Sequence, residues 1–254
     1  MITALAYGNN LLRMGNMTFG MLTPPEPPTP TLPPYTIRMK FIDGVTPTFS
    51  KGTATQVTSS PNVWDLTYEN NNWSLLIKSQ TNLLEVIGAN TVGVTNMSNM
   101  FYKCASITTV PLFNTSKATD MNNMFNGCTS LTSVPLFDTS NVTNMSSMFY
   151  KCASITTVPL FNTSKATRML SMFYNCSSLT SVPLFDTSKV KSMSQMLQNC
   201  YNVQSGALAL YQQASTQATP PSQYTDAFKY CGRDTVTGAA ELAQIPASWG
   251  GTAS

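Results

Sequence analysis

The sequence predicts an elongated solenoid, in which short repeated units stack along one axis. Residues of the same type recur along the chain at a constant step of 24. A fixed period between 20 and 50 residues is typical of repeat architectures, whose units bury their apolar sides only against neighbouring units. The recurring residues are Cys104, Cys128, Cys152, Cys176 and Cys200; Met97, Met121, Met145, Met169 and Met193; Met100, Met124, Met148, Met172 and Met196; and Phe101, Phe125, Phe149 and Phe173.

The repeat extends beyond this obvious block. One step before Met97, Met100 and Phe101 the chain carries Trp73, Leu76 and Ile77, which are also apolar. At the other end, the Phe-x-x-Cys spacing returns at 228–231, farther from Cys200 than one regular step. We therefore expect the solenoid to span 73–231, with a seven-residue insertion in its last unit that includes the prolines at 220–221.

Each end of the solenoid has a predicted cap. Apolar and polar residues alternate over 35–41 and again over 62–68, as expected of half-buried strands, so residues 35–72 are predicted to form a small β cap. Residues 238–245 (GAAELAQI) predict a short helix that ends before Pro246, within a C-terminal cap over 232–254. Trp249 would cover the final unit. Such caps protect end surfaces that would otherwise expose strand edges and apolar side chains.

The segment that precedes the first cap, 1–34, has a different composition. Residues 1–22 do not match a secretion signal, because the apolar stretch breaks at Gly8 and the first basic residue is Arg13. Seven of the twelve residues in 23–34 are proline, which favours a stiff, extended linker. We expect 1–22 to be an attachment segment that the linker holds away from the solenoid. Its proposed attachment residues are Leu11, Leu12, Met14 and Phe19.

Within one unit, the spacing of Ile107, Val110 and Leu112 matches the L-x-x-L-x-L pattern of leucine-rich repeats. The apolar steps of three and four residues over 118–128 favour a short helix or 3₁₀ turn on the other side of the unit. The predicted fold class is therefore an α/β solenoid of the leucine-rich repeat type. The proline that each unit carries, as at Pro111, removes a backbone donor and limits the parallel strands to about three to five residues.

The strongest binding candidate is a row of side chains on the outside of the predicted strands. Because side chains alternate between the two faces of a strand, Val110 and Leu112 should point inward and their neighbours outward. A shift of one residue in strand phase would instead bury the phenylalanines of the row. The predicted outward ladder is Phe113, Phe137, Phe161 and Phe185, beside Thr109, Ser133, Thr157 and Ser181.

Other repeated side chains have structural explanations. The cysteine column favours buried, small apolar residues over disulfides, because every neighbour in it is equivalent. The methionine columns lie on the inner side of the helical segment and favour core packing. The column of Thr115, Thr139, Thr163 and Thr187, with the serines that follow, is expected to bond turn carbonyls between units.

The composition argues against several function classes. The chain contains no histidine and only 10% charged residues, so we expect no enzyme, no metal site and no cofactor. Its net charge of +3 gives no electrostatic footprint for nucleic acid, and no apolar run is long enough for membrane insertion.

The repeated unit resembles the BspA-like leucine-rich repeat family of bacterial surface proteins, whose recurrent phrase FDTSNVTNMSSMF stands at 137–149. Members of that family are regarded as adhesins. The segments 206–215 and 238–252 also resemble sequences encoded by tailed phages of gut bacteria, which are regarded as virion proteins. These resemblances imply a virion surface protein, a fibre or decoration protein, that contacts other virion proteins through its N-terminus and binds host or mucosal glycans or proteins. An architectural virion protein and a bacterial cell-surface adhesin are the alternatives. A homo-oligomer is compatible with the sequence but is not required by it.

Overall fold

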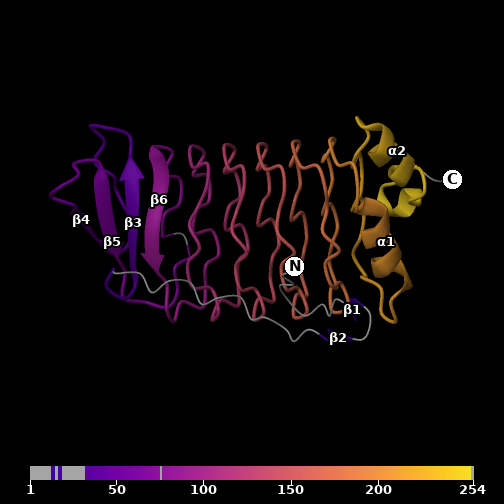
Figure 1. Ribbon diagram of the computed structural model, residues 1–254, viewed down its shortest axis with the longest axis horizontal. Coiled ribbons are helices and arrows are strands. Elements are labelled where there is room, and N and C mark those ends of the chain that lie inside the picture. Colours follow the sequence, from indigo (N-terminus) through magenta and orange to yellow (C-terminus); the bar gives the residue numbers. More distant parts are fainter. Residues whose placement is uncertain (1–12, 15–16, 19–31, 75, 253–254) are drawn as a thin grey trace.

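The computed structural model describes residues 13–14, 17–18, 32–74 and 76–252. Its long axis runs from a small β-sheet at one end to two helices at the other, with turns of chain side by side between them (Figure 1). The separate two-residue strands β1 (Arg13–Met14) and β2 (Met17–Thr18) pair with each other in an antiparallel manner.

The sheet at the first end has four antiparallel strands in the order β4-β5-β3-β6. They are β3 (Thr36–Phe41), β4 (Thr53–Gln56), β5 (Val63–Thr67) and β6 (Leu83–Asn90). Strands β3 and β5 correspond to the two segments whose alternation predicts strands. In β3 the side chains of Ile37, Met39 and Phe41 are buried, as that alternation requires.

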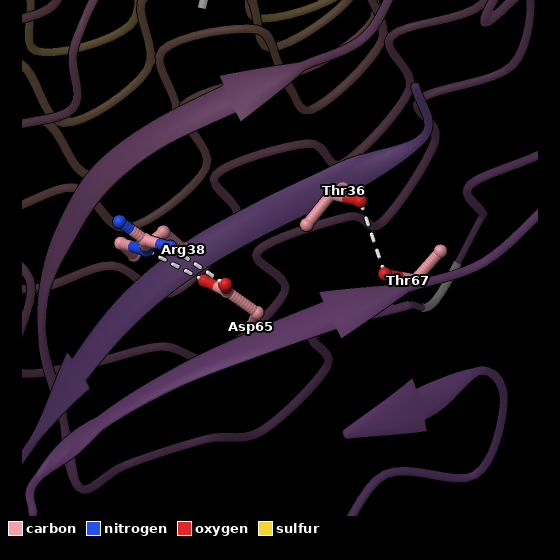
Figure 2. Close-up of polar contacts among 4 residues, drawn as sticks. All are labelled: Thr36, Arg38, Asp65 and Thr67. Carbon is pink, nitrogen blue, oxygen red and sulfur yellow. Dashed lines mark hydrogen bonds and ion pairs between the residues drawn. The ribbon is translucent and has the colours of Figure 1, made fainter. Parts of the chain in front are cut away.

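Two directly opposite residue pairs hold β3 against β5 (Figure 2). Arg38 donates from Nε and Nη2 to the two carboxylate oxygens of Asp65, each at 2.7 Å. The hydroxyls of Thr36 and Thr67 bond each other at 3.0 Å. The hydrogen bond to Asp65 raises the pKa of Arg38, although the pair is partly exposed and its effect on stability is therefore modest.

The predicted boundaries of this cap differ from those observed. Strand β6 comes from residues that the sequence assigns to the first solenoid unit, and it pairs along the whole length of β3. The linker also ends earlier than predicted, because Leu32 is buried and its carbonyl accepts a hydrogen bond of 3.0 Å from Asn90 Nδ2. The sheet thus includes residues from both sides of the predicted 35–72 segment.

Successive 24-residue units lie in register between the two ends. Isolated parallel bridges link the equivalent residues Asn72, Asn96, Asp120, Asn144, Arg168, Ser192 and Gln223. The bridge at Asn72 agrees with the extension of the repeat back to Trp73, and the bridge from Ser192 to Gln223 agrees with the longer step predicted for the last unit.

The main backbone ladder uses every second amide. The N–H groups of Met97, Asn99, Phe101 and Lys103 donate to carbonyls of the next unit, at 2.9, 2.8, 2.9 and 2.7 Å. The amides between them close turns inside their own unit, as Tyr102 does by donating to the Asn99 carbonyl at 3.1 Å. We call this segment of each unit the turn ladder. Most of its amides therefore have a partner, although only alternate ones reach the next unit.

These turns require left-handed backbone at two places in each unit. Asn99 and Lys103 have φ values of 57° and 58°, and the equivalent residues follow them. Glycine adopts this conformation without strain and asparagine tolerates it better than most residues, although the units also carry lysine there, at Lys103 and Lys151. Gly127, with φ of 78°, occupies the position of Lys103 one unit later.

Secondary structure within the units differs from the leucine-rich repeat prediction. Between residues 91 and 205, all of which the structure describes, the chain forms turns and isolated bridges but no helix and no extended strand. The expected helical segment is the turn ladder itself. In the expected strand segment the proline of each unit lacks an N–H, and only the bridge between Ser181 and Ser205 forms.

Two helices close the far end. Helix α2 (Val236–Leu242) corresponds to the predicted C-terminal helix, and the 3₁₀ helix η1 (Ala247–Trp249) follows Pro246. Trp249 is buried, and its carbonyl accepts a hydrogen bond of 2.9 Å from the amide of Phe228 in the last unit. Trp249 therefore covers the final unit, as predicted.

Helix α1 (Ala207–Thr216) is not predicted and occupies the enlarged last unit. It packs inward through Ala207, Leu210 and Ala214, a spacing of three and four residues that the sequence already contains. Gly206 precedes it with φ of 96°, and a Cβ at this position would clash with the Val182 carbonyl oxygen. Only glycine fits between α1 and the preceding unit.

The core is continuous from the sheet to the helices. The cysteine, methionine and phenylalanine columns that define the repeat are buried throughout, which confirms the prediction that they pack inside. Phe101, Phe125, Phe149 and Phe173 stack on one another with centroid distances of 5.4, 5.7 and 5.5 Å.

The buried threonine column joins consecutive units, as expected from the sequence. The hydroxyls of Thr115, Thr139 and Thr163 donate to carbonyls 23 residues later, at 2.8, 2.9 and 2.9 Å. The serine that follows behaves differently: the amide of Ser140, for example, donates to the Asp138 side chain within its own turn. The threonines therefore supply the contact between units.

We expect Thr139→Val to lower the free energy of unfolding by about 1–3 kcal/mol, because it removes a fully buried hydroxyl and leaves the Asn162 carbonyl without that donor. Urea unfolding of the full chain measures the change. Thr143→Val is the matched control: its exposed hydroxyl shares the Thr119 carbonyl with its own amide, so the loss should stay within about 0.5 kcal/mol. Equal losses for the two variants would contradict this role.

Candidate functional site

The predicted outward phenylalanine ladder is wrong, because these side chains are in the core. Phe113, Phe137, Phe161 and Phe185 are at most 2% exposed. Their rings pack against the inner phenylalanine column: Phe137 lies 6.3 Å from Phe125, and Phe161 lies 6.2 Å from Phe149. They stabilise the interior and are not available to a ligand.

In the units of Phe137 and Phe185, the reason for the reversal is a tight turn at the proline. The amide of Phe137 donates to the Pro135 carbonyl at 2.9 Å, two residues earlier, and Phe185 bonds Pro183 in the same way. A hydrogen bond of this span defines a γ-turn, which breaks the alternation of an extended strand. Two successive residues then face outward before the phenylalanine turns inward, and this is the one-residue change of phase that alternation alone leaves open.

A leucine column takes the outward place instead. Leu112, Leu160 and Leu184 are 36%, 41% and 52% exposed, although the sequence pattern predicts that Leu112 is buried. Leu136, the equivalent residue between the first two, is half-buried. We call the set Leu112, Leu136, Leu160 and Leu184 the leucine column. Its exposed members are not needed for the core, so their apolar surface is free to bind a partner.

Hydroxyl groups flank the leucine column. Thr109, Ser133 and Thr157 are exposed and Ser181 is half-buried, so the predicted outward position of this set holds. The adjacent residues Thr108, Thr132 and Thr156 are also exposed, and the Thr132 hydroxyl donates to the Thr108 carbonyl at 3.1 Å. The face therefore combines apolar and hydroxyl groups in rows that repeat from unit to unit.

A second surface feature, which the sequence reading missed, lies at the turn ladder. Tyr150 and Tyr174 stack with a centroid distance of 4.8 Å, and Lys151 Nζ lies 5.4 Å from the Tyr150 ring centre. Near the last unit, the Arg233 guanidinium lies 4.4 Å from the Tyr201 ring. The adjacent Tyr-Lys pairs at 102–103 and 150–151 were the available signal. Because neighbouring groups already cover these rings, they offer less free surface than the leucine column.

The cysteine thiols are unsuited to chemistry at the surface. All six cysteines are free and buried, and the thiol of Cys128 donates to the Phe101 carbonyl at 3.1 Å. Burial raises the pKa of Cys104 to about 12, and it also raises the pKa values of Cys128, Cys176 and Cys231 well above the ordinary value. A thiol that stays protonated is a poor nucleophile and a poor metal ligand.

The carboxylates at the unit corners serve the turns. Asp138 and Asp186 each accept a hydrogen bond from the backbone amide two residues later, at 3.0 and 2.8 Å. Such side-chain turns are the usual role of aspartate at these positions. Among the described residues, histidine, cysteine and acidic side chains form no group of three or more that could hold a metal ion.

The predicted attachment residues cannot be placed. Leu11, Leu12 and Phe19 lie outside the described residues, and Met14 is described only as backbone in β1. Attachment through residues 1–22 therefore stays a prediction. In the part of the chain that the structure describes, no helix has the length and apolar character needed to cross a membrane.

The raised pKa values predict that the thiols stay unreactive in the folded protein. At pH 10 an ordinary thiol is largely ionised, but the Cys104 thiol, with a pKa of about 12, keeps its proton and is also shielded. We expect iodoacetamide to label the folded chain at pH 10 no faster than the chain unfolds, and to label six thiols in urea. Mass spectrometry counts the labels; rapid labelling of the folded chain would contradict this arrangement.

Comparisons with known proteins place the repeat in a family. A family model described as "Mycoplasma protein of unknown function, DUF285" matches residues 71–179 and 95–211, which together cover more than half of the chain. No curated protein and no solved structure matches the chain. The match is compatible with the resemblance to BspA-like repeat proteins and covers most of the stacked units. The chain therefore belongs to the DUF285 family.

Proposed function

We propose that this chain is a non-enzymatic binding protein, a leucine-rich-repeat-type solenoid on the surface of a virion that adheres to host or mucosal glycans or proteins. The observation that carries the proposal is the exposed leucine column with its flanking hydroxyls. Apolar side chains on a regular, rigid face favour adhesion, because they gain free energy when a partner covers them and lose little conformational freedom.

The arrangement of polar groups supports a binding role over catalysis. The sequence contains no histidine, and Asp138 and Asp186 are engaged in turns. The thiols are buried, and burial raises the pKa of Cys104 and Cys128. A general base and an activated nucleophile are the usual requirements of an enzyme site. The repeated columns instead present one kind of surface many times, which suits multivalent contact.

Attachment to a virion rests on the sequence resemblances described above. We propose that residues 1–22 contact other virion proteins and that the proline-rich segment holds the stacked units away from them. Labelling the chain in intact particles for electron microscopy tests this location. Density at the particle surface is the expected result, whereas a cell-wall location would favour the bacterial adhesin.

Changes to the leucine column test its role directly. We expect Leu160→Asp and Leu184→Asp to weaken binding of the purified chain to immobilised mucin or to host cells by about tenfold or more, because each places a charge in an apolar contact. Surface-based binding measurements give the affinity, and thermal unfolding checks that the fold is intact.

Leu170→Asp is the matched control for these changes. Leu170 is 41% exposed, the same as Leu160, but it lies on the turn ladder, away from the leucine column. Binding should therefore be unchanged. If the Leu160 variant binds as well as the Leu170 variant, the leucine column is not the adhesive face. If the Leu160 variant loses only contacts to other virion proteins, the chain is architectural.

A further inference from the structure

A small pocket lies at the seam between the last three units. It has a volume of about 340 Å³ and is lined by Thr167, Arg168, Lys191, Ser192, Ser222 and Gln223. These residues come in three pairs from equivalent positions, because parallel bridges join Arg168 to Ser192 and Ser192 to Gln223. The last pair directly follows the enlarged loop that contains α1, so the pocket forms where the regular repeat changes.

The walls of the pocket are held by backbone hydrogen bonds. The amide of Lys191 donates to the Thr167 carbonyl at 2.9 Å, and the amides of Ser222 and Gln223 both donate to the Lys191 carbonyl at 3.1 Å. The fold therefore does not need the side chains of Arg168 and Lys191 for its own pairing. Both are exposed and free to contact a ligand.

Within the part of the chain that the structure describes, the two cations have no acidic partner. The ion pairs among the described residues are Arg38–Asp65, Lys229–Asp226 and Arg233–Asp234, and none of them involves the pocket. The aspartate that precedes Lys191 along the chain, Asp186, accepts a hydrogen bond from the amide of Ser188. A guanidinium and an ammonium group without counter-charges, on neighbouring units, form a positive site.

Ser192 provides a second, independent indication. The residue is only 8% exposed, and its hydroxyl has no hydrogen-bond partner among the described residues. The buried serine Ser98 differs, because its hydroxyl bonds that of Ser74 at 2.9 Å. Leaving a buried hydroxyl unpaired costs free energy, so unsatisfied groups of this kind call for an explanation such as a ligand.

We propose that this pocket binds an acidic sugar, with Arg168 and Lys191 contacting its sulfate ester or carboxylate and Ser192 donating a hydrogen bond to it. The proposal rests on the proposed adhesive function and names a ligand class for it. The hydroxyl and amide groups of Thr167, Ser222 and Gln223 suit sugar hydroxyls, and the volume is at the lower end of the range for small-ligand sites.

The charge pattern along the same row favours a single anionic group over a long polyanion. The residue equivalent to Arg168 is Asn144 one unit earlier and Asp120 two units earlier. A nucleic acid lying along the stack would therefore meet a carboxylate within two units, whereas its binding requires a row of cations. A sugar with one acidic substituent would contact only the part of this row that carries Arg168, and not Asp120.

Calorimetric titration of the full chain with N-acetylglucosamine 6-sulfate, glucuronic acid, N-acetylglucosamine and inorganic sulfate tests the proposal. One of the two acidic sugars should bind, and which one does identifies the substituent; the neutral sugar should bind at least about tenfold more weakly. Arg168→Gln and Lys191→Gln should each reduce the affinity for the acidic sugar about tenfold. Lys117→Gln should have no effect, because this exposed lysine lies two units away from the pocket. Its neighbour Thr119 is the equivalent of Thr167 two units earlier.

Ser192→Ala separates ligand binding from a structural role. Since the hydroxyl has no hydrogen-bond partner among the described residues, its removal should not lower the thermal midpoint but should weaken binding of the acidic sugar. A lowered midpoint with unchanged binding would overturn the role of Ser192. Equal binding of the acidic and neutral sugars, binding of inorganic sulfate alone, or no effect of Arg168→Gln would overturn the site.

Failure of this site is distinguishable from failure of the adhesive function. Titration with a monosaccharide measures binding to the pocket alone, and Leu160→Asp should leave the affinity for the acidic sugar unchanged. Mucin binding that depends on the leucine column, together with no acidic-sugar binding, would overturn the pocket and retain the adhesive face.

Discussion

The hydrogen bonds between consecutive units are the constraint on which the rest of the structure depends. In the turn ladder one amide in two donates to the next unit, and amides between them close turns within their own unit. The turns closed within each unit require left-handed backbone at two positions of the turn ladder, which explains the residues with positive φ. It also explains why the ladder forms isolated bridges and not extended strands.

Because the ladder holds units in register, identical side chains come together inside the stack. Each phenylalanine lies on the one before it, and each cysteine thiol from Cys104 to Cys200 donates to a carbonyl of the preceding unit. Because each core side chain packs against its equivalents in the units before and after it, a substitution in one column affects the packing of both neighbouring units. The core can thus be extended by whole units, while the outward residues vary without affecting the register.

Two surfaces follow from this construction and differ in kind. The leucine column repeats with the units and offers a periodic apolar and hydroxyl face. The pocket beside Arg168 and Lys191 occurs where the step between units lengthens and the loop with α1 returns to the ladder. A regular repeat produces equivalent positions, and an irregularity in it produces a single site.

The sequence by itself determined the step, the strands at 35–41 and 62–68, the helix before Pro246 and the burial of the cysteine and methionine columns. These follow from periodicity, which survives without knowledge of backbone direction. The tertiary structure decided which residues of the segments 131–137 and 179–185 face outward, because the γ-turns after Pro135 and Pro183 change the phase of alternation. It also decided the pocket, since Arg168, Ser192 and Gln223 become neighbours only when three units stack.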